Sequence, residues 1–169
     1  MRFYGLALAM SALVLGACGG GDDTAANDTA GATATPDAGT AAPAGAAGTA
    51  TAAPVTGTVH EVRMVGDAQG FRFDPATVDA KVGDGIKYIM VSGGPHNVAF
   101  ENVTDAAAKA QIDANIPAAE KMSELQTRYY QNAGEEVTIS MANVPAGTYS
   151  VLCVPHAAMN MRMTINLTQ

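Results

Sequence analysis

The chain has 169 residues with a formal net charge of −7, and 48% of its residues are hydrophobic while only 5% are aromatic. This acidic balance excludes a nucleic-acid-binding function, which needs clustered basic side chains to displace counterions. The two cysteines, Cys18 and Cys153, are too few for an iron–sulfur cluster held by cysteines alone.

Residues 1–18 have the pattern of an export signal. Arg2 supplies a positive start, and the apolar run from Tyr4 to Gly16 is shorter than the roughly 20 residues that a membrane-spanning helix needs. Its end, Leu15-Gly16-Ala17-Cys18, resembles the lipobox of bacterial lipoproteins. The resemblance implies that Cys18 is lipidated and anchors an exported protein on the periplasmic or extracellular side of a membrane. The alternatives are an ordinary cleavage site with a chance cysteine, or an apolar end that is not cleaved.

A low-complexity segment follows the signal. Residues 19–54 consist almost entirely of Ala, Gly, Thr, Pro, Asp and Asn, without a single Lys, Arg or aromatic residue. Such a composition cannot offset the entropy of ordering. We therefore expect residues 19–55 to be a disordered tether and residues 56–169 to form one folded domain.

From residue 56 the chain alternates short runs rich in Val, Ile, Tyr, Phe and Thr with Gly, Pro, Asn and Asp, which predicts an all-β sandwich. The last strand shows the clearest alternation, with Met161, Met163, Ile165 and Leu167 on one face. The strands that we expect are Thr58–Met64, Phe71–Phe73, Thr77–Val82, Ile86–Val91, Asn97–Glu101, Gln126–Gln131, Glu136–Met141, Thr148–Cys153 and Met161–Leu167.

One segment, Thr104–Leu125, departs from the β pattern because it is rich in Ala, Lys, Glu and Gln. It begins Thr104-Asp105, as at a helix N-cap, and Pro117 interrupts it. We predict two short helices, inserted at one edge of the sandwich.

The C-terminal segment places a thiolate (Cys153), an imidazole (His156) and two thioethers (Met159 and Met161) within nine residues. Pro155, between the first two, favours a tight turn that presents both side chains to one point. Few loops are so rich in soft metal ligands.

A second imidazole, His96, follows the turn Gly93-Gly94-Pro95 and opens a predicted strand. A thiolate, two imidazoles and a weak thioether form the donor set of a trigonal copper site with a long axial bond. Zinc would accept the first three ligands but gains little from a methionine. We therefore expect one copper ion.

These residues resemble the cupredoxins, and most of all the plastocyanin, amicyanin and pseudoazurin group. The resemblance covers residues 57–169, and it implies a Greek-key β-sandwich with a type 1 copper site. The motifs that carry it are Gly94-Pro95-His96-Asn97-Val98, the Cys153-x-Pro155-His156 turn with its methionines, and Phe73-x-Pro75 followed by Val82-Gly83-Asp84.

The same resemblance implies that His96, Cys153 and His156 are the equatorial ligands. Asn97 would tie the two ligand loops together, with Pro155 shaping the turn between the ligands. Members of the family place the axial methionine six or eight residues after the cysteine, which leaves Met159 and Met161 open. We favour Met161, because the spacing resembles pseudoazurins and strand alternation turns it inward.

Other roles for Cys153 explain fewer of these residues than a copper site does. A buried structural thiol would account for Cys153 alone but not for the matching histidines, and a Cys–His nucleophile lacks an orienting group and an oxyanion site. His60 matches no family ligand, so we expect a packing or solvated role for it.

The function that we predict is electron transfer through Cu(I) and Cu(II), without enzymatic activity, by a monomer that meets a redox partner such as a cytochrome or a cuproenzyme. Contact with the membrane would be through the lipid anchor alone. The alternative is periplasmic copper storage or delivery, which a retentive thiolate site disfavours.

Overall fold

The computed structural model describes residues 50–169. The predicted export signal with Cys18, and residues 19–49 of the predicted tether, lie outside the described residues. Among residues 50–169, no helix combines the length and the apolar character that crossing a membrane requires.

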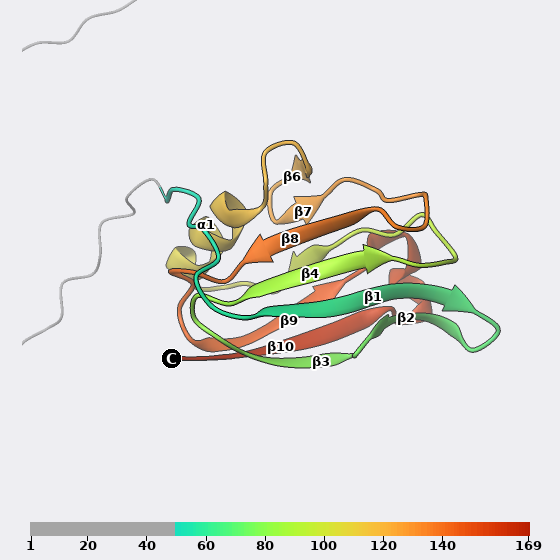
Figure 1. Cartoon of the computed structure of the whole chain (residues 1–169), viewed down its shortest axis with the longest axis horizontal. Coiled ribbons are helices and arrows are strands. Elements are labelled where there is room, and N and C mark those ends of the chain that lie inside the picture. Colours follow the sequence, from blue (N-terminus) through green and yellow to red (C-terminus); the bar gives the residue numbers. More distant parts are fainter. Residues whose placement is uncertain (1–49) are drawn as a thin grey trace, which may run out of the picture. The chain divides into compact units, whose positions relative to one another are not determined.

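The described residues form a sandwich of two β-sheets, so the predicted all-β fold class is confirmed (Figure 1). The first sheet has the order β2-β1-β4-β8 and the second has the order β3-β10-β9-β5-β7-β6. Two of the strand pairs, β1 with β4 and β10 with β3, are parallel. The strands are β1 (Val59–Asp67), β2 (Gly70–Asp74), β3 (Thr77–Lys81), β4 (Gly85–Met90), β5 (Ala99–Glu101), β6 (Lys121–Ser123), β7 (Gln126–Thr127), β8 (Glu136–Ser140), β9 (Gly147–Leu152) and β10 (Arg162–Thr168).

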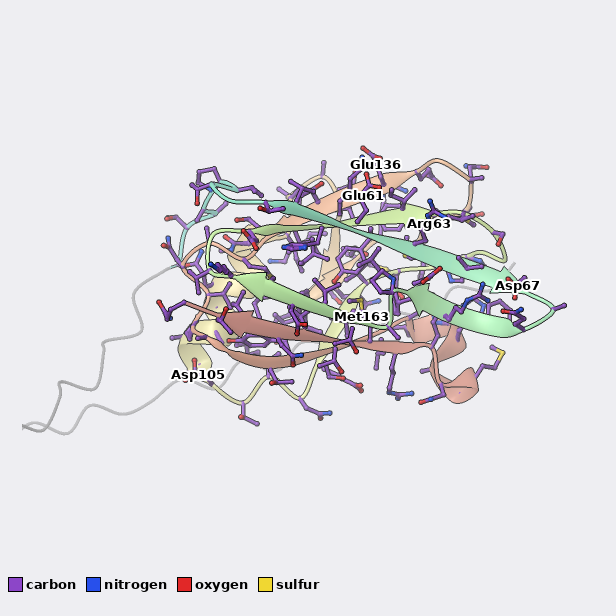
Figure 2. The ribbon with its side chains drawn as sticks, turned by 60° about the horizontal axis from the view of Figure 1, so that its bottom comes forward. Glu61, Arg63, Asp67, Asp105, Glu136 and Met163 are labelled. Atoms are coloured by element: carbon purple, nitrogen blue, oxygen red, sulfur yellow. The ribbon has the colours of Figure 1, made fainter. Side chains whose placement is uncertain are left out.

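Alternating side chains on the strands build the core between the sheets. On β10, Met163, Ile165 and Leu167 are buried, as the sequence pattern predicted. Figure 2 shows Met163 directed between the sheets, whereas Glu61 and Glu136 point outward. The two sheets thus enclose an apolar interior and carry charged side chains on their outer faces.

The insertion between β5 and β7 contains one helix, α1 (Ala106–Asn115), capped by the Asp105 side chain, which accepts a hydrogen bond from the backbone N–H of Ala108. The prediction of a second helix after Pro117 is wrong. The chain there makes a turn and then the short strand β6, which pairs with β7. The residues available before β7 are too few for a stable second helix, and Lys121 instead forms an ion pair with Asp113 of α1.

The last residues of the predicted tether contact the folded domain. The backbone N–H of Ala53 donates to Asn115 Oδ1 at 2.9 Å, and Gln111 Nε2 donates to the carbonyl of Thr51 at 2.9 Å. The ordered chain therefore begins before residue 56, because polar side chains on α1 supply partners for its backbone.

Strands β4 and β9 run to the same end of the sandwich, on the right in Figure 1, while the C-terminus and α1 lie at the other end. Each of these two strands is followed by a loop that carries a candidate ligand. We call this end of the sandwich the metal end.

Candidate metal centre

The pairing of β5 with β9 brings together two loops that are far apart in the sequence. Ala99 lies opposite Leu152, so His96, just before β5, comes near Cys153, just after β9. A β-bridge to Tyr130 holds the backbone of His96 on its other side, with N···O distances of 3.0 and 2.7 Å. Sheet register therefore delivers both residues to one point.

The turn after Cys153 folds back tightly to present His156. It forms a 3-10 helix, η1 (Val154–Met159), with Pro155 in its first turn, where a missing N–H costs nothing. The backbone N–H of His156 donates to the Cys153 carbonyl at 3.1 Å, and Asn160 ends the turn with a φ of 59°. Asparagine tolerates this left-handed conformation better than most residues.

The three candidate ligands face one another. Cys153 Sγ lies 3.5 Å from His96 Nδ1 and 3.4 Å from His156 Nδ1, and the two Nδ1 atoms are 3.2 Å apart. The centre of this nearly equilateral triangle is about 2 Å from each of the three atoms. That distance is the length of a metal–nitrogen bond in proteins, so the donor set fits a metal ion.

Burial makes the centre unfavourable for charge when no cation is bound. Burial raises the pKa of the Cys153 thiol, although backbone N–H groups of Asn97 and His156 act in the opposite direction. Burial also lowers the pKa of His96 and of His156. A bound cation reverses the preference at sulfur, because it stabilises the thiolate form.

The outer nitrogen of His96 is held by the backbone. His96 Nε2 lies 2.8 Å from the Ser92 carbonyl oxygen, so Nε2–H donates and Nδ1 keeps its lone pair for a metal. This arrangement assigns the tautomer that ligation through Nδ1 requires.

Asn97 connects the two ligand loops. Its Oδ1 accepts a hydrogen bond from the backbone N–H of Val154 at 2.8 Å. Its Nδ2 is buried and has no hydrogen-bond partner within residues 50–169.

The two candidate axial methionines lie in different surroundings. Met161 is fully buried. Its backbone N–H donates a hydrogen bond to the His156 carbonyl at 3.2 Å, and its carbonyl accepts one from the Cys153 N–H at 3.0 Å. Met159 is 50% exposed. The position of Met161 therefore favours it over Met159 as the thioether nearest the centre.

The structure also contains a contact at the centre that sequence reasoning missed. The Phe71 ring stacks on the His156 imidazole with a centroid distance of 3.7 Å and an interplanar angle of 11°. Phe71 is an ordinary strand aromatic in the sequence, so no pattern marks it as a neighbour of His156.

His60 stands apart from the centre. It does not belong to the group of His96, Cys153 and His156, and its Nε2 lies 2.8 Å from Asp84 Oδ2. Its partner is thus a carboxylate on the turn before β4.

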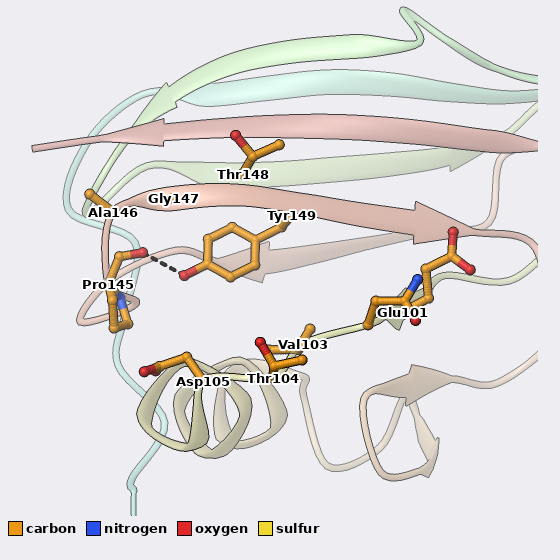
Figure 3. Close-up of a pocket in the computed structure, with 10 residues that line it drawn as sticks. Glu101, Val103, Thr104, Asp105, Pro145, Ala146, Gly147, Thr148 and Tyr149 are labelled. Atoms are coloured by element: carbon orange, nitrogen blue, oxygen red, sulfur yellow. Dashed lines mark hydrogen bonds between the residues drawn. The ribbon is translucent and has the colours of Figure 1, made fainter.

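A cleft of about 280 Å³ lies at the opposite end, between the start of α1 and the start of β9 (Figure 3). Its lining residues include no histidine or cysteine. The Tyr149 hydroxyl donates to the Pro145 carbonyl at 2.6 Å, and Glu101 accepts from Ser150 and Arg162. Tyr149 and Glu101 of the cleft are thus hydrogen-bonded within the protein.

A β-sandwich that converges a buried thiol and two imidazoles at the end of its sheets defines the cupredoxin class of metal-binding domain. Residues 60–168 match the model of the family described as copper binding proteins, plastocyanin/azurin family. The chain belongs to this family of copper-binding proteins, and one copper ion is its cofactor.

Several individual proteins are similar to this chain. Plastocyanin from Ulva prolifera is 31% identical over 106 residues, which cover 63% of this chain and 96% of that protein. Plastocyanin from Daucus carota is 28% identical over 109 residues, covering 64% and 99% of the two chains. A solved structure of a mutant fern plastocyanin is 23% identical with a TM-score of 0.48, covering 64% of this chain and all of that one. A pseudoazurin from Methylobacterium extorquens AM1 is also 23% identical, with a TM-score of 0.42 and coverage of 66% and 76%.

Proposed function

We propose that His96, Cys153 and His156 bind the copper ion as equatorial ligands and that Met161 is the axial ligand. The observation that carries the proposal is the near-equilateral triangle of Sγ and two Nδ1 atoms, with edges of 3.2 to 3.5 Å. Copper bound there supplies one-electron chemistry between Cu(I) and Cu(II).

The surrounding residues suit this site to electron transfer. Cys153 and His96 are fully buried and belong to loops braced by sheet pairing, so the fold itself supports the ligand positions. Rigid ligands keep the geometry alike in both oxidation states, and little reorganisation then opposes electron transfer. The domain is an electron carrier rather than an enzyme.

His156 is the ligand that reaches the surface. It is 6% exposed and is surrounded by uncharged exposed residues, which we call the metal-end patch: Pro95, Val154, Pro155, Ala158 and Met159. A small apolar patch suits a brief encounter with a redox protein such as a cytochrome or a cuproenzyme, because interfaces below roughly 1,200 Å² release quickly. The protein works as a monomer in this scheme.

The N-terminal region gives the carrier its location. Lipidation of Cys18 would anchor the exported protein at the membrane, and the tether that starts at residue 19 would let the domain leave the membrane surface. The motif Leu15-Gly16-Ala17-Cys18 supports this part of the proposal.

The experiment that tests the proposal compares redox cycling with copper loss. The copper-loaded protein should undergo reversible one-electron reduction and keep its copper in both states, whereas Cys153→Ser should lose tight binding. Rapid transfer of copper to a chelator without facile redox cycling would contradict electron transfer and support storage or delivery.

A further inference from the structure

Phe71 contacts both imidazoles of the metal centre. Its ring is stacked on His156 at 3.7 Å and meets His96 edge-on, with a centroid distance of 6.1 Å and an interplanar angle of 68°. Phe71 is the second residue of β2 and is only partly buried, so its ring covers one face of His156 toward the β1–β2 hairpin.

The Phe71 ring also lies close to the backbone of its own hairpin. Gly66 pairs with Phe71 across the hairpin, and a Cβ atom on Gly66 would lie 2.7 Å from Phe71 Cε1 and 2.8 Å from Gly93 Cα. Real Cβ atoms do not approach so closely, so the ring keeps this place only because residue 66 is glycine. The ring is thus confined by both the hairpin backbone and the imidazole.

The same hairpin also braces His96. The backbone N–H of Gly66 donates to the Ser92 carbonyl at 2.8 Å, and the Ser92 hydroxyl donates to the Gly66 carbonyl at 3.0 Å. That Ser92 carbonyl oxygen is the acceptor for His96 Nε2–H. The hairpin therefore supports one imidazole indirectly, through the Ser92 carbonyl, and the other directly, through an aromatic stack.

The two imidazoles differ in how their orientation is fixed. A metal-binding histidine usually donates its second ring N–H to a carbonyl or carboxylate, which sets the ring plane. His96 does so through Ser92, but within the described part of the chain the polar contacts of the His156 ring are made only by Nδ1. An aromatic stack in van der Waals contact can fix a ring plane in place of the missing hydrogen bond.

We propose that Phe71 is a positioning residue that holds the His156 imidazole in the plane where Nδ1 faces Cys153 Sγ and His96 Nδ1. This inference rests on the proposed copper site and adds a residue that acts on a ligand from the opposite sheet. Loss of the stack frees the His156 ring to rotate, and copper is then held less tightly in the Cu(I) state.

The test compares three variants of the full protein. Phe71→Leu removes the aromatic face, Phe71→Tyr keeps it, and Phe73→Leu makes the same substitution two residues along β2, where the ring meets Tyr88 at 6.0 Å instead of a ligand. The measurements are the rate at which the Cu(I) protein releases copper to a chelator and the visible and EPR spectra of the Cu(II) protein. The free energy of unfolding of the copper-free protein measures general damage.

We expect Phe71→Leu to release Cu(I) about tenfold faster than the native protein, with altered Cu(II) spectra. Phe71→Tyr should retain the native rate and spectra. Phe73→Leu should lower the free energy of unfolding while its copper release and spectra stay native. Native release and spectra in Phe71→Leu, or equal changes in Phe71→Leu and Phe73→Leu, would overturn the inference.

A copper-free readout separates this inference from the proposed function. In the copper-free protein, the ring current of Phe71 should shift the NMR signals of the His156 ring protons upfield, and Phe71→Leu should abolish that shift. A native protein without a copper–thiolate band would refute the copper site. An intense band together with unshifted His156 protons would refute the role of Phe71 alone.

Discussion

The side-chain oxygen of Asn97 accepts a hydrogen bond from the backbone N–H of Val154 at 2.8 Å, which joins the loop that carries His96 to the loop that carries Cys153 and His156. The two loops follow strands of different sheets, β4 and β9. Sheet pairing brings the two ligand loops close together, and the Asn97 side chain then links them directly.

Replacing Asn97 by alanine should weaken copper retention more than it weakens the fold. The loss of one hydrogen bond should lower the free energy of unfolding of the copper-free protein by about 1 kcal/mol. Copper release should become about tenfold faster, because a group that fixes ligand loops is lost. Denaturant unfolding and chelator competition measure the two effects.

Asn166→Ala is the matched control for this substitution. Asn166 lies on β10 and donates to Asp79 at an exposed site. Its removal should change the free energy of unfolding by less than about 0.5 kcal/mol and leave copper release unchanged. Equal copper release from the Asn97→Ala and Asn166→Ala variants would show that the bridge between the loops has no role.

The two methionines should respond differently to replacement by leucine. Met161→Leu removes a buried thioether, and we expect a higher reduction potential, because Cu(II) loses more than Cu(I) when an axial donor is withdrawn. Met159→Leu changes an exposed side chain and should leave the potential unchanged. Voltammetry of both variants decides the axial ligand. A large shift in Met159→Leu beside an unchanged Met161→Leu would reverse the assignment.

The Tyr88 hydroxyl is buried in the core and has no hydrogen-bond partner within residues 50–169. Burial of an unsatisfied hydroxyl costs about 1 to 3 kcal/mol. Tyr88→Phe should therefore raise the free energy of unfolding by about 1 kcal/mol, measured by urea denaturation. A decrease of similar size would mean that the hydroxyl is satisfied in solution.

Asp84 should make stability depend on pH at the end of the sandwich away from the copper. Two hydrogen bonds lower the pKa of Asp84 below its ordinary value of 3.8. The larger effect comes from the Lys81 backbone N–H and the smaller from the His60 ring. A carboxyl with a depressed pKa stabilises the fold above its ordinary pKa, and this contribution is lost as the pH falls through the lower folded value. Asp84→Asn should lower the free energy of unfolding by about 2 kcal/mol at pH 7.

The difference between the native protein and Asp84→Asn should shrink as the pH falls below 3.8, because protonation removes the same interactions from the native protein. Denaturant titrations of the copper-free protein at pH 7, 5 and 3 measure it. Asp74→Asn, at an exposed position on the same sheet, should change stability by less than about 0.5 kcal/mol throughout. A difference of equal size at pH 3 and pH 7 would be inconsistent with this role for Asp84.

Charge placed on the metal-end patch should slow electron exchange without altering the copper site. Ala158→Glu puts a carboxylate beside His156, so two molecules that meet patch to patch repel each other and must desolvate both charges. The self-exchange rate, measured by NMR line broadening, should fall about tenfold, with an unchanged visible spectrum. Ala146→Glu adds the same charge at the opposite end and should have little effect. Similar rates in both variants would exclude the patch as the route for electrons.

The sequence predicted most of the centre because its main donors are local. Cys153, His156, Met159 and Met161 lie in one turn and just before one strand, and the alternation of the predicted strand Met161–Leu167 correctly placed Met161 in the interior. His96 could be paired with them through the family motif, and the geometry brings it to the same point.

The parts that were missed depend on contacts between distant segments. Phe71 meets His156 only because the two sheets pack at a particular separation, and Tyr130 brackets His96 only because the insertion returns as a strand. The prediction of a second helix was wrong because it also depended on such a contact. The pairing of β6 with β7 outweighed the helix propensity of the segment. Propensity and motif spacing contain no information on such pairings.

The absorption spectrum of the copper-loaded protein tests the central claim most directly, because only a copper–thiolate bond in a trigonal site yields an intense visible band. The account predicts such a band at about 600 nm, which disappears when Cys153 is replaced by serine. A colourless Cu(II) complex, or an intense band that survives the loss of Cys153, would contradict it.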